Sequence, residues 1–217
     1  MSRENALTDT SWVVGRRRGR PPSSDSAVTR KRILHAARET FAEVGFEAAT
    51  FHAIATRAGL TRPAINNYFA SKSLLYREVM CQTSNGVLEG IHEASSAPTL
   101  SGQIVEFIQV AILSQGADPS VAGFLVQAAL QAKRRPELGG GDSDAVMLIE
   151  QFVRGSVAAA DQRGELASGP DTDALTDTLI GVVWGMAFQI SSGGSRDGRR
   201  VVDEVNRLLT RGLLRDP

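Results

Sequence analysis

Residues 51–70, FHAIATRAGLTRPAINNYFA, contain two short helical patterns separated by Gly59. A glycine suits a tight turn between helices because it adopts a left-handed backbone without strain. With Gly59 in the turn, Ala55 falls where the two helices cross, and its small side chain allows their close approach. The apolar positions that would hold such a pair together are all filled, by Ile54, Ala58, Leu60 and Ile65. The spacing predicts a helix-turn-helix, whose second helix enters the major groove of DNA.

The flanking residues predict two further helices. Upstream, one apolar stripe recurs at spacings of three and four residues, formed by Ile33, Leu34, Ala37, Phe41 and Val44. Gly45 is expected to end that helix in a left-handed cap. Downstream, Ser71 is expected to cap a fourth helix over about residues 71–93.

The rest of the chain predicts helices only. Beyond residue 95, apolar stripes of helical period alternate with segments rich in Gly, Pro and Ser, and no run alternates with period two. We therefore expect an all-α fold of about nine helices: a disordered basic tail (1–25), a three-helix DNA-binding domain (26–75) and a C-terminal helical domain (76–217).

Charge is distributed unevenly along the 217 residues, although the net charge is zero. Residues 1–80 hold 13 Lys and Arg against 7 Asp and Glu, and the remainder holds 11 against 17. This asymmetry favours contact between the first part and a polyanion. The single cysteine, Cys81, excludes an internal disulfide and fits the cytoplasm. The apolar stretch 179–190 is shorter than the roughly 20 residues that a membrane span needs, so we expect no membrane partner.

The sequence from Ile33 to Met80 resembles the DNA-binding domain of the TetR family of transcriptional regulators. The resemblance lies in the Phe-Ala-Glu-x-Gly end of the first helix, the Ile-Ala-x-x-Ala-Gly-Leu turn and the Tyr-Phe-x-Ser-Lys junction. It implies a homodimer that binds a palindromic operator. It also implies that the C-terminal domain binds a small-molecule effector and dimerises.

Candidate DNA contacts follow from the second helix of the motif. Arg62 has the geometry to pair with guanine and Asn66 with adenine, and Ala64 is small enough to contact a thymine methyl group. The family places phosphate contacts at positions that match Thr50, Tyr68 and Lys72. The full set of candidates in the domain is Thr50, Thr61, Arg62, Ala64, Asn66, Asn67, Tyr68 and Lys72.

The tail contains a second basic motif, RRRGRPP at residues 16–22, which resembles an AT-hook. An extended Arg-Gly-Arg fits a narrow minor groove, and A·T-rich grooves attract arginine. The candidates are Arg16, Arg17, Arg18 and Arg20. The alternative is a basic tail that adds only nonspecific attraction.

The resemblance also implies sites in the C-terminal domain. Candidate effector contacts, chosen as aromatic walls with a few polar groups, are Phe107, Phe124, Gln127, Gln131, Met147, Phe152, Trp184 and Gln189. Candidate dimer contacts come from the two last helices and are Leu179, Gly181, Trp184, Gly185, Val205, Leu208 and Leu209.

Other classes of function have less support. His35, His52 and His92 lack a metal-ligand spacing, residues 139–141 lack the Gly-Lys-Ser/Thr of a phosphate loop, and no cofactor motif is present, so we expect no enzyme and no cofactor. Two alternatives remain open: an architectural DNA-binding protein without an effector, and an activator of the same fold. Repression is the commoner mode in the family.

Overall fold

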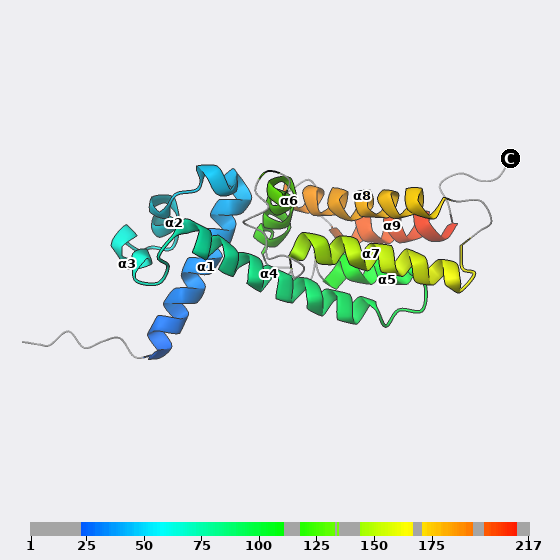
Figure 1. Ribbon diagram of the computed structural model, residues 1–217, viewed down its shortest axis with the longest axis horizontal. Coiled ribbons are helices and arrows are strands. Elements are labelled where there is room, and N and C mark those ends of the chain that lie inside the picture. Colours follow the sequence, from blue (N-terminus) through cyan, green and yellow to red (C-terminus); the bar gives the residue numbers. More distant parts are fainter. Residues whose placement is uncertain are drawn as a thin grey trace, which may run out of the picture.

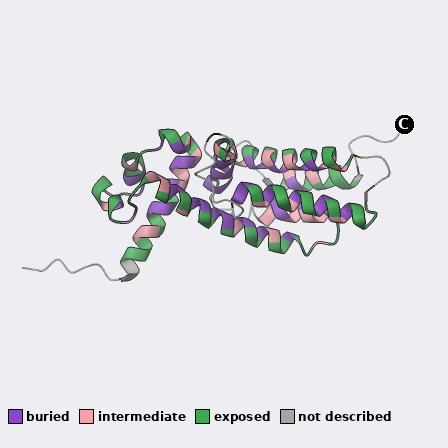
Figure 2. Cartoon of the chain, in the orientation of Figure 1, coloured by how far each residue is buried: buried purple, intermediate pink, exposed green. Residues whose placement is uncertain are grey.

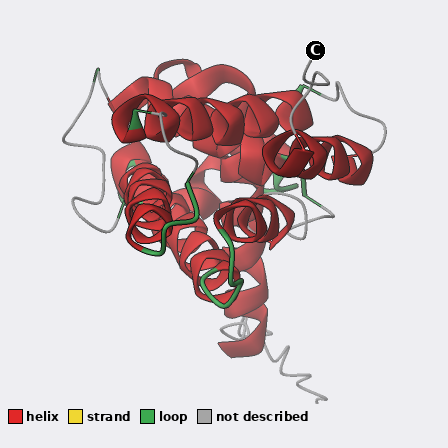
Figure 3. Ribbon diagram, turned by 90° about the vertical axis from the view of Figure 1, so that its right-hand side faces the viewer, coloured by secondary structure: helices red, strands yellow, loops and turns green. Residues whose placement is uncertain are grey.

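The structure is a computed structural model that describes residues 23–110, 118–132, 134, 144–166, 171–192 and 198–211. These ranges contain nine helices and no strand (Figure 3). In chain order the helices are α1 (Ser23–Ala48), α2 (Phe51–Arg57), α3 (Arg62–Asn66), α4 (Lys72–Ala94), α5 (Leu100–Phe107), α6 (Ser120–Ala132), α7 (Ala145–Gln162), α8 (Thr172–Ser191) and α9 (Gly198–Arg211). The predicted all-α fold of about nine helices is confirmed.

The helices form an elongated molecule with α2 and α3 at one end (Figure 1). Helices α5, α7, α8 and α9 lie together in the other part, and α6 lies between the two parts. The long helix α4 runs from one part into the other, packing on α1 as well as on α5 and α7. The expected domain boundary between residues 75 and 76 therefore falls inside one continuous helix.

Helix α1 follows the predicted pattern except at its end. Ile33, Leu34, Ala37 and Phe41 are buried, whereas Val44 is 50% exposed. Gly45 has the predicted left-handed backbone (φ 73°), and one more helical turn follows it to Ala48. The non-helical backbone at Gly45 kinks the helix directly after Val44.

The core is continuous from one part to the other, along the inward faces of the helices (Figure 2). An aromatic cluster of Phe41, Phe46, Tyr76 and Phe124 joins α1, α4 and α6, with Tyr76 and Phe124 centroids 5.3 Å apart. Burial, together with the negative charge of Asp144, raises the pKa of Tyr76. The cluster means that α6 packs directly on α1 and α4, near the end of the molecule that contains α2 and α3.

Helix α8 is long and apolar enough to cross a membrane by length and composition alone. Its buried residues are Thr176, Leu179, Val183, Met186 and Ala187. It packs against α6 and α7. A core helix of a helical protein has the same properties, so α8 gives only weak support for a membrane span.

Candidate nucleic-acid interface

Local sequence forms the α2–turn–α3 unit. Thr50 begins α2 by accepting a hydrogen bond from the Ala53 backbone N–H (3.1 Å), and Thr61 does the same for Ala64 (3.4 Å). Pro63 stands in the first turn of α3, where a missing N–H costs nothing. Threonine caps of this kind contribute about 1 kcal/mol each. Every one of these contacts joins residues close in sequence.

The turn has the predicted geometry. Gly59 has φ +62°, and no atom lies within 4 Å of where a Cβ would stand, so the backbone conformation rather than space requires glycine there. The Leu60 N–H donates to the Ala55 carbonyl (2.8 Å) and closes the turn. Ile54, Ala55, Ala58 and Ile65 are buried between the helices.

The outer side of α3 presents polar side chains to solvent. Arg62 and Asn66, one helical turn apart, are exposed together with Asn67, whereas Ala64 and Tyr68 are half-buried. Thr50 and Thr61 are also exposed, but their hydroxyls cap helices. Helix α3 and its C-cap residue thus expose one guanidinium and two amides, the groups that the sequence predicts for base contacts.

Lys72 makes internal contacts that the sequence did not predict. Its Nζ donates to the carbonyls of Phe46 (2.6 Å), Ala49 (2.9 Å) and Glu47 (3.0 Å), and lies 4.5 Å from the centre of the Phe46 ring. An ammonium group has three N–H donors, and here all three have carbonyl partners. Lys72 therefore holds the end of α1 against the start of α4, close to the cap of α2.

Two ion pairs also brace the unit. Arg30 on α1 bonds Glu78 on α4 (2.9 Å) and lies over the Phe69 ring, 5.0 Å from its centre. Arg57 at the end of α2 bonds Glu43 on α1 (2.6 Å). The first pair connects α1 to α4, and the second connects α1 to α2.

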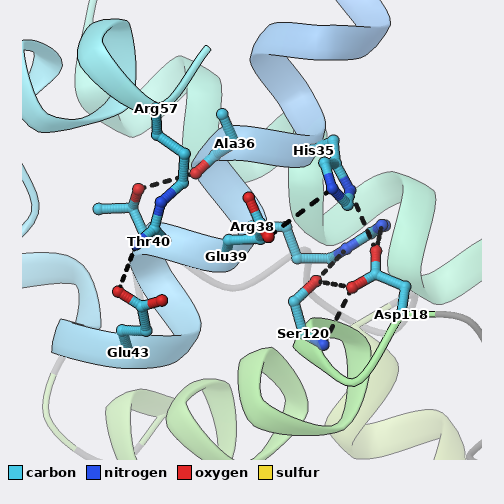
Figure 4. A network of polar contacts seen from close by, with 9 residues as sticks. All are labelled: His35, Ala36, Arg38, Glu39, Thr40, Glu43, Arg57, Asp118 and Ser120. Atoms are coloured by element: carbon cyan, nitrogen blue, oxygen red, sulfur yellow. Dashed lines mark hydrogen bonds and ion pairs between the residues drawn. The ribbon is translucent and has the colours of Figure 1, made fainter.

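A polar network joins α1 to the start of α6 (Figure 4). Asp118 accepts hydrogen bonds from Arg38 on α1 and from Ser120, and its Oδ2 lies 3.1 Å from Nδ1 of His35. Burial alone would raise the pKa of Asp118, but the hydrogen bonds from Ser120 and Arg38, with the charge of Arg38, outweigh burial and lower it. No sequence signal identified this network, because Arg38 and Asp118 are 80 residues apart.

The eight candidate effector contacts have different surroundings within the part of the chain that the structure describes. Phe107 and Phe124 are fully buried; Phe107 packs on Phe152 (5.0 Å between ring centres), and Phe124 belongs to the aromatic cluster. Gln189 is exposed. Residues on one helix divide between its inward and outward faces, so these side chains have different surroundings, and their role as effector contacts stays a prediction.

Two of the eight, Met147 and Trp184, line an open groove of about 890 Å³ between α6, α7 and α8. Its walls are mostly apolar, with Arg134 and Glu150 as the charged residues. The remaining lining residues are Val126, Ala129, Leu130, Ala132, Val146, Ile180, Gly185 and Phe188. Leu130, Met147 and Phe188 are 58%, 42% and 57% exposed, which is unusual for large apolar side chains at one place.

The candidate dimer contacts also divide. Gly181 and Gly185 are exposed with nothing within 4 Å of a would-be Cβ, and Leu208 and Leu209 are exposed on α9. Trp184 and Val205 are half-buried. Leu179 is a correction: it is 1% exposed because it lies on the inward face of α8, and it is unavailable to a partner.

Some candidates fall outside the described residues, namely Arg16, Arg17, Arg18 and Arg20 of the tail. Among the described residues, no group of three or more His, Cys, Asp or Glu side chains could hold a metal ion.

Comparison with known proteins identifies the same motif. Residues 33–79 match the family described as "Bacterial regulatory proteins, tetR family". The transcriptional repressor AcnR of Corynebacterium efficiens is 24% identical over 187 residues (84% of this chain, 93% of AcnR). The transcriptional activator FasR of Mycolicibacterium smegmatis is 34% identical over 85 residues (39% of this chain, 38% of FasR). In fold, the chain is similar to FadR of Bacillus subtilis, solved in complex with stearoyl-CoA, with TM-score 0.63 and 18% identity over 85% of this chain and 99% of that one.

Proposed function

The chain is a DNA-binding transcriptional regulator of the TetR family, and from this premise we propose that it is an effector-responsive repressor that binds a palindromic operator as a homodimer. The observation that carries the proposal is the exposed pair Arg62 and Asn66 on a capped α3. Both side chains can form bidentate contacts with a base. No catalytic step is proposed, and the site of action is the cytoplasm.

Base reading is proposed for α3, with Arg62 and Asn66 as the specificity contacts and Ala64, Asn67 and Tyr68 beside them. We propose that Thr50, Thr61 and Lys72 support phosphate binding mainly by holding the N-termini of α2 and α3 in position. The two threonines cap helices whose N-termini attract phosphate, and Lys72 holds the first of these caps in place.

Two features support dimerisation: the uncovered outer face of α8 and the short length of α3. A five-residue α3 reads few base pairs, so a second copy one helical turn of DNA away, about 34 Å, adds the missing specificity. Exposed Gly181 and Gly185 would let a partner helix approach closely. A large, contiguous and exposed apolar surface on a protein marks a site where another molecule binds.

Effector binding is proposed for the part of the chain that contains α4 to α8. FadR, a fold neighbour, was solved with stearoyl-CoA, which makes that compound the first probe rather than the assigned effector. An effector can change DNA affinity only by binding the two states of the dimer unequally. The test is operator release on adding the probe.

The central test is selection of duplex DNA by the full chain, followed by binding measurements on the selected site. A palindrome is expected, and Arg62→Ala should weaken binding by about 1–3 kcal/mol and relax the base preference at one position of each half-site. The matched control is Arg154→Ala, which removes the same charge from an exposed position on α7. Selection of no palindrome would refute the dimeric repressor.

The tail has a separate test. Replacing Arg16, Arg17, Arg18 and Arg20 by alanine should weaken binding more for operators flanked by A·T than by G·C pairs, since narrow A·T grooves attract arginine. It should also reduce the salt dependence, by about 0.9 in the logarithmic slope for each lost phosphate contact. Equal losses on both flanks would leave nonspecific attraction as the role of the tail.

Two alternatives are separable by the same experiments. An architectural protein would enrich only A·T-rich DNA and lose that preference with the tail. An activator would select the same palindrome but raise transcription in a reporter assay. The similarity to FasR, a transcriptional activator, is the reason for including the reporter assay.

A further inference from the structure

Asp118 connects the two parts of the molecule because its side chain bonds both α1 and the start of α6. It accepts from the backbone N–H of Ser120, the first residue of α6 (3.0 Å), and it accepts a charge-assisted bond from Arg38 on α1. Arg38 adds a second bond, from Nε to the Ser120 hydroxyl (3.1 Å). The Arg38 and Asp118 side chains are each only 18% exposed, where such bonds are stronger than at an open surface. The start of α6 is thus bonded directly to the middle of α1.

Close packing continues this contact along α6. A Cβ on Gly123 would lie 3.0 Å from the Ala42 Cβ, and a Cβ on Gly45 would lie 3.2 Å from the Gln127 side chain. Helix α6 therefore meets α1 at three levels, at Asp118 and Ser120, at Gly123 and at Gln127. We call these contacts the α1–α6 junction. Sliding or rotating α6 would break the bonds at one level or cause overlap at another.

The same helix touches α8. The Ser191 Cβ lies 3.5 Å from the Cβ position of Gly123, on the side of α6 that faces the end of α8. Helix α8 carries the face proposed for dimerisation, and α1 packs on α2 of the helix-turn-helix. Helix α6 is consequently in contact with both.

We propose that Asp118 and Arg38 are positioning residues for operator binding: they hold α6 in one register on α1, so that the dimer face of α8 sets the separation of the two recognition helices. The proposal rests on the homodimer and palindrome proposed above. It concerns neither base contacts nor the effector, because neither residue lies on α3 or lines the α6–α7–α8 groove.

The test uses Asp118→Asn in the full chain, with operators whose half-sites are separated by one or two added base pairs, each adding about 3.4 Å. The parent is expected to reject the added spacing. The variant should bind the native operator about ten-fold more weakly, within the range of about 5–150-fold typical of coupling between sites, and should lose most of its spacing preference. Binding to an isolated half-site should be unchanged. Full retention of spacing preference by Asp118→Asn would overturn the proposal.

Glu165→Gln is the matched control. Glu165 also accepts from the first backbone N–H of a helix, that of Leu100 in α5 (2.6 Å), and also bonds an arginine, Arg163 (2.7 Å), but neither partner lies in the DNA-binding part. Spacing preference should be intact in this variant. An equal loss of preference in Glu165→Gln would mean that general loosening, rather than the junction, explains the effect. Arg38→Lys, which keeps the charge, should restore part of the affinity that Arg38→Met loses.

A distance measurement separates failure of this inference from failure of the proposed function. Spin labels at Ala53→Cys on α2 and Ala158→Cys on α7, both exposed, would report the separation of the two parts in Cys81→Ser protein diluted with unlabelled chain. A narrow distribution that Asp118→Asn broadens supports the junction even if the parent selects no palindrome. An unchanged distribution in Asp118→Asn refutes it.

Discussion

The α1–α6 junction and the outer face of α8 both contain glycines, but these glycines have opposite surroundings. At the junction, Gly123 brings α6 so close to α1 that an added Cβ would meet the Ala42 side chain at 3.0 Å. On α8, Gly181 and Gly185 have nothing within 4 Å. Glycine thus marks a filled contact in the first case and an uncovered face in the second.

Large apolar side chains show the same difference. Phe124 on α6 is fully buried against Tyr76 and Phe41, whereas Phe188 on α8 is 57% exposed. A contact that is complete within one chain contributes to the stability of that chain. A face without cover contributes only when something binds it. Substitutions can therefore distinguish the two regions, by changing stability in one and association in the other.

The largest expected effect is that of Phe124→Ala. Removing this ring from the aromatic cluster should lower the free energy of unfolding by about 3–5 kcal/mol. Phe188→Ala should change protomer stability by less than about 0.5 kcal/mol but weaken the dimer. Urea unfolding and sedimentation equilibrium measure the two quantities. If Phe188→Ala cost as much in unfolding while association stayed constant, the face of α8 would be covered within the protomer.

The next largest effect is expected for Asp118→Asn, which should lower the free energy of unfolding by about 1.5–3 kcal/mol at neutral pH. This is the range for hydrogen bonds to charged groups. Because the folded pKa of Asp118 lies below the ordinary value of about 3.9, the unfolded chain takes up this proton first as the pH falls. Stabilisation by Asp118 is therefore complete above that ordinary value and is lost as the pH falls through the folded pKa.

The measurement is urea unfolding of the parent and Asp118→Asn between pH 3 and pH 7. The difference between the two chains should shrink towards acid. A difference that stays constant over this range would show that the Asp118 charge is not what stabilises the junction.

A pair of glycine substitutions should give smaller effects. Gly123→Ala should destabilise by about 1–3 kcal/mol, because α6 and α1 must separate to admit a methyl group. Gly185→Ala should stabilise the isolated helix by up to about 1 kcal/mol, through helix propensity, while weakening dimerisation. Thermal unfolding at several protein concentrations distinguishes the two outcomes. Tighter association of Gly185→Ala would place the dimer contact elsewhere.

The smallest effect is expected for Glu43→Gln, which breaks the ion pair with Arg57 at the surface of α1 and α2. The Glu43 side chain is 60% exposed, and exposed ion pairs contribute about 0.2–1 kcal/mol to the free energy of unfolding. Stability measured by urea unfolding should change by no more than that. If Glu43→Gln lowered the free energy of unfolding as much as Asp118→Asn, the ion pairs along α1 would stabilise the fold jointly, and the junction would not be special among them.

The sequence by itself determined the helix-turn-helix. Thr50, Thr61 and Gly59 act on backbone groups within a few residues of themselves, so their roles can be predicted from spacing alone. The buried set Ile54, Ala55, Ala58 and Ile65 follows from the same spacing, as does the exposure of Arg62 and Asn66. The candidate DNA contacts remain predictions, but their placement on α3 was available from the sequence.

Tertiary structure decided which face of each C-terminal helix is covered. Helix α8 is apolar nearly all round, so its periodicity did not distinguish Leu179, which is buried, from Gly181 and Gly185, which are exposed. The sequence favoured a core role over effector contact for Phe107 and Phe124, and their neighbours in the fold place both in the core. Neither the junction nor the contacts of Lys72 could be predicted, since Arg38 and Asp118 are 80 residues apart and Lys72 bonds carbonyls 23–26 residues away, and no local pattern encodes such pairings. Local hydrogen bonds and backbone conformation can be predicted from neighbouring residues, whereas burial and long-range pairing depend on where the whole chain brings its helices together.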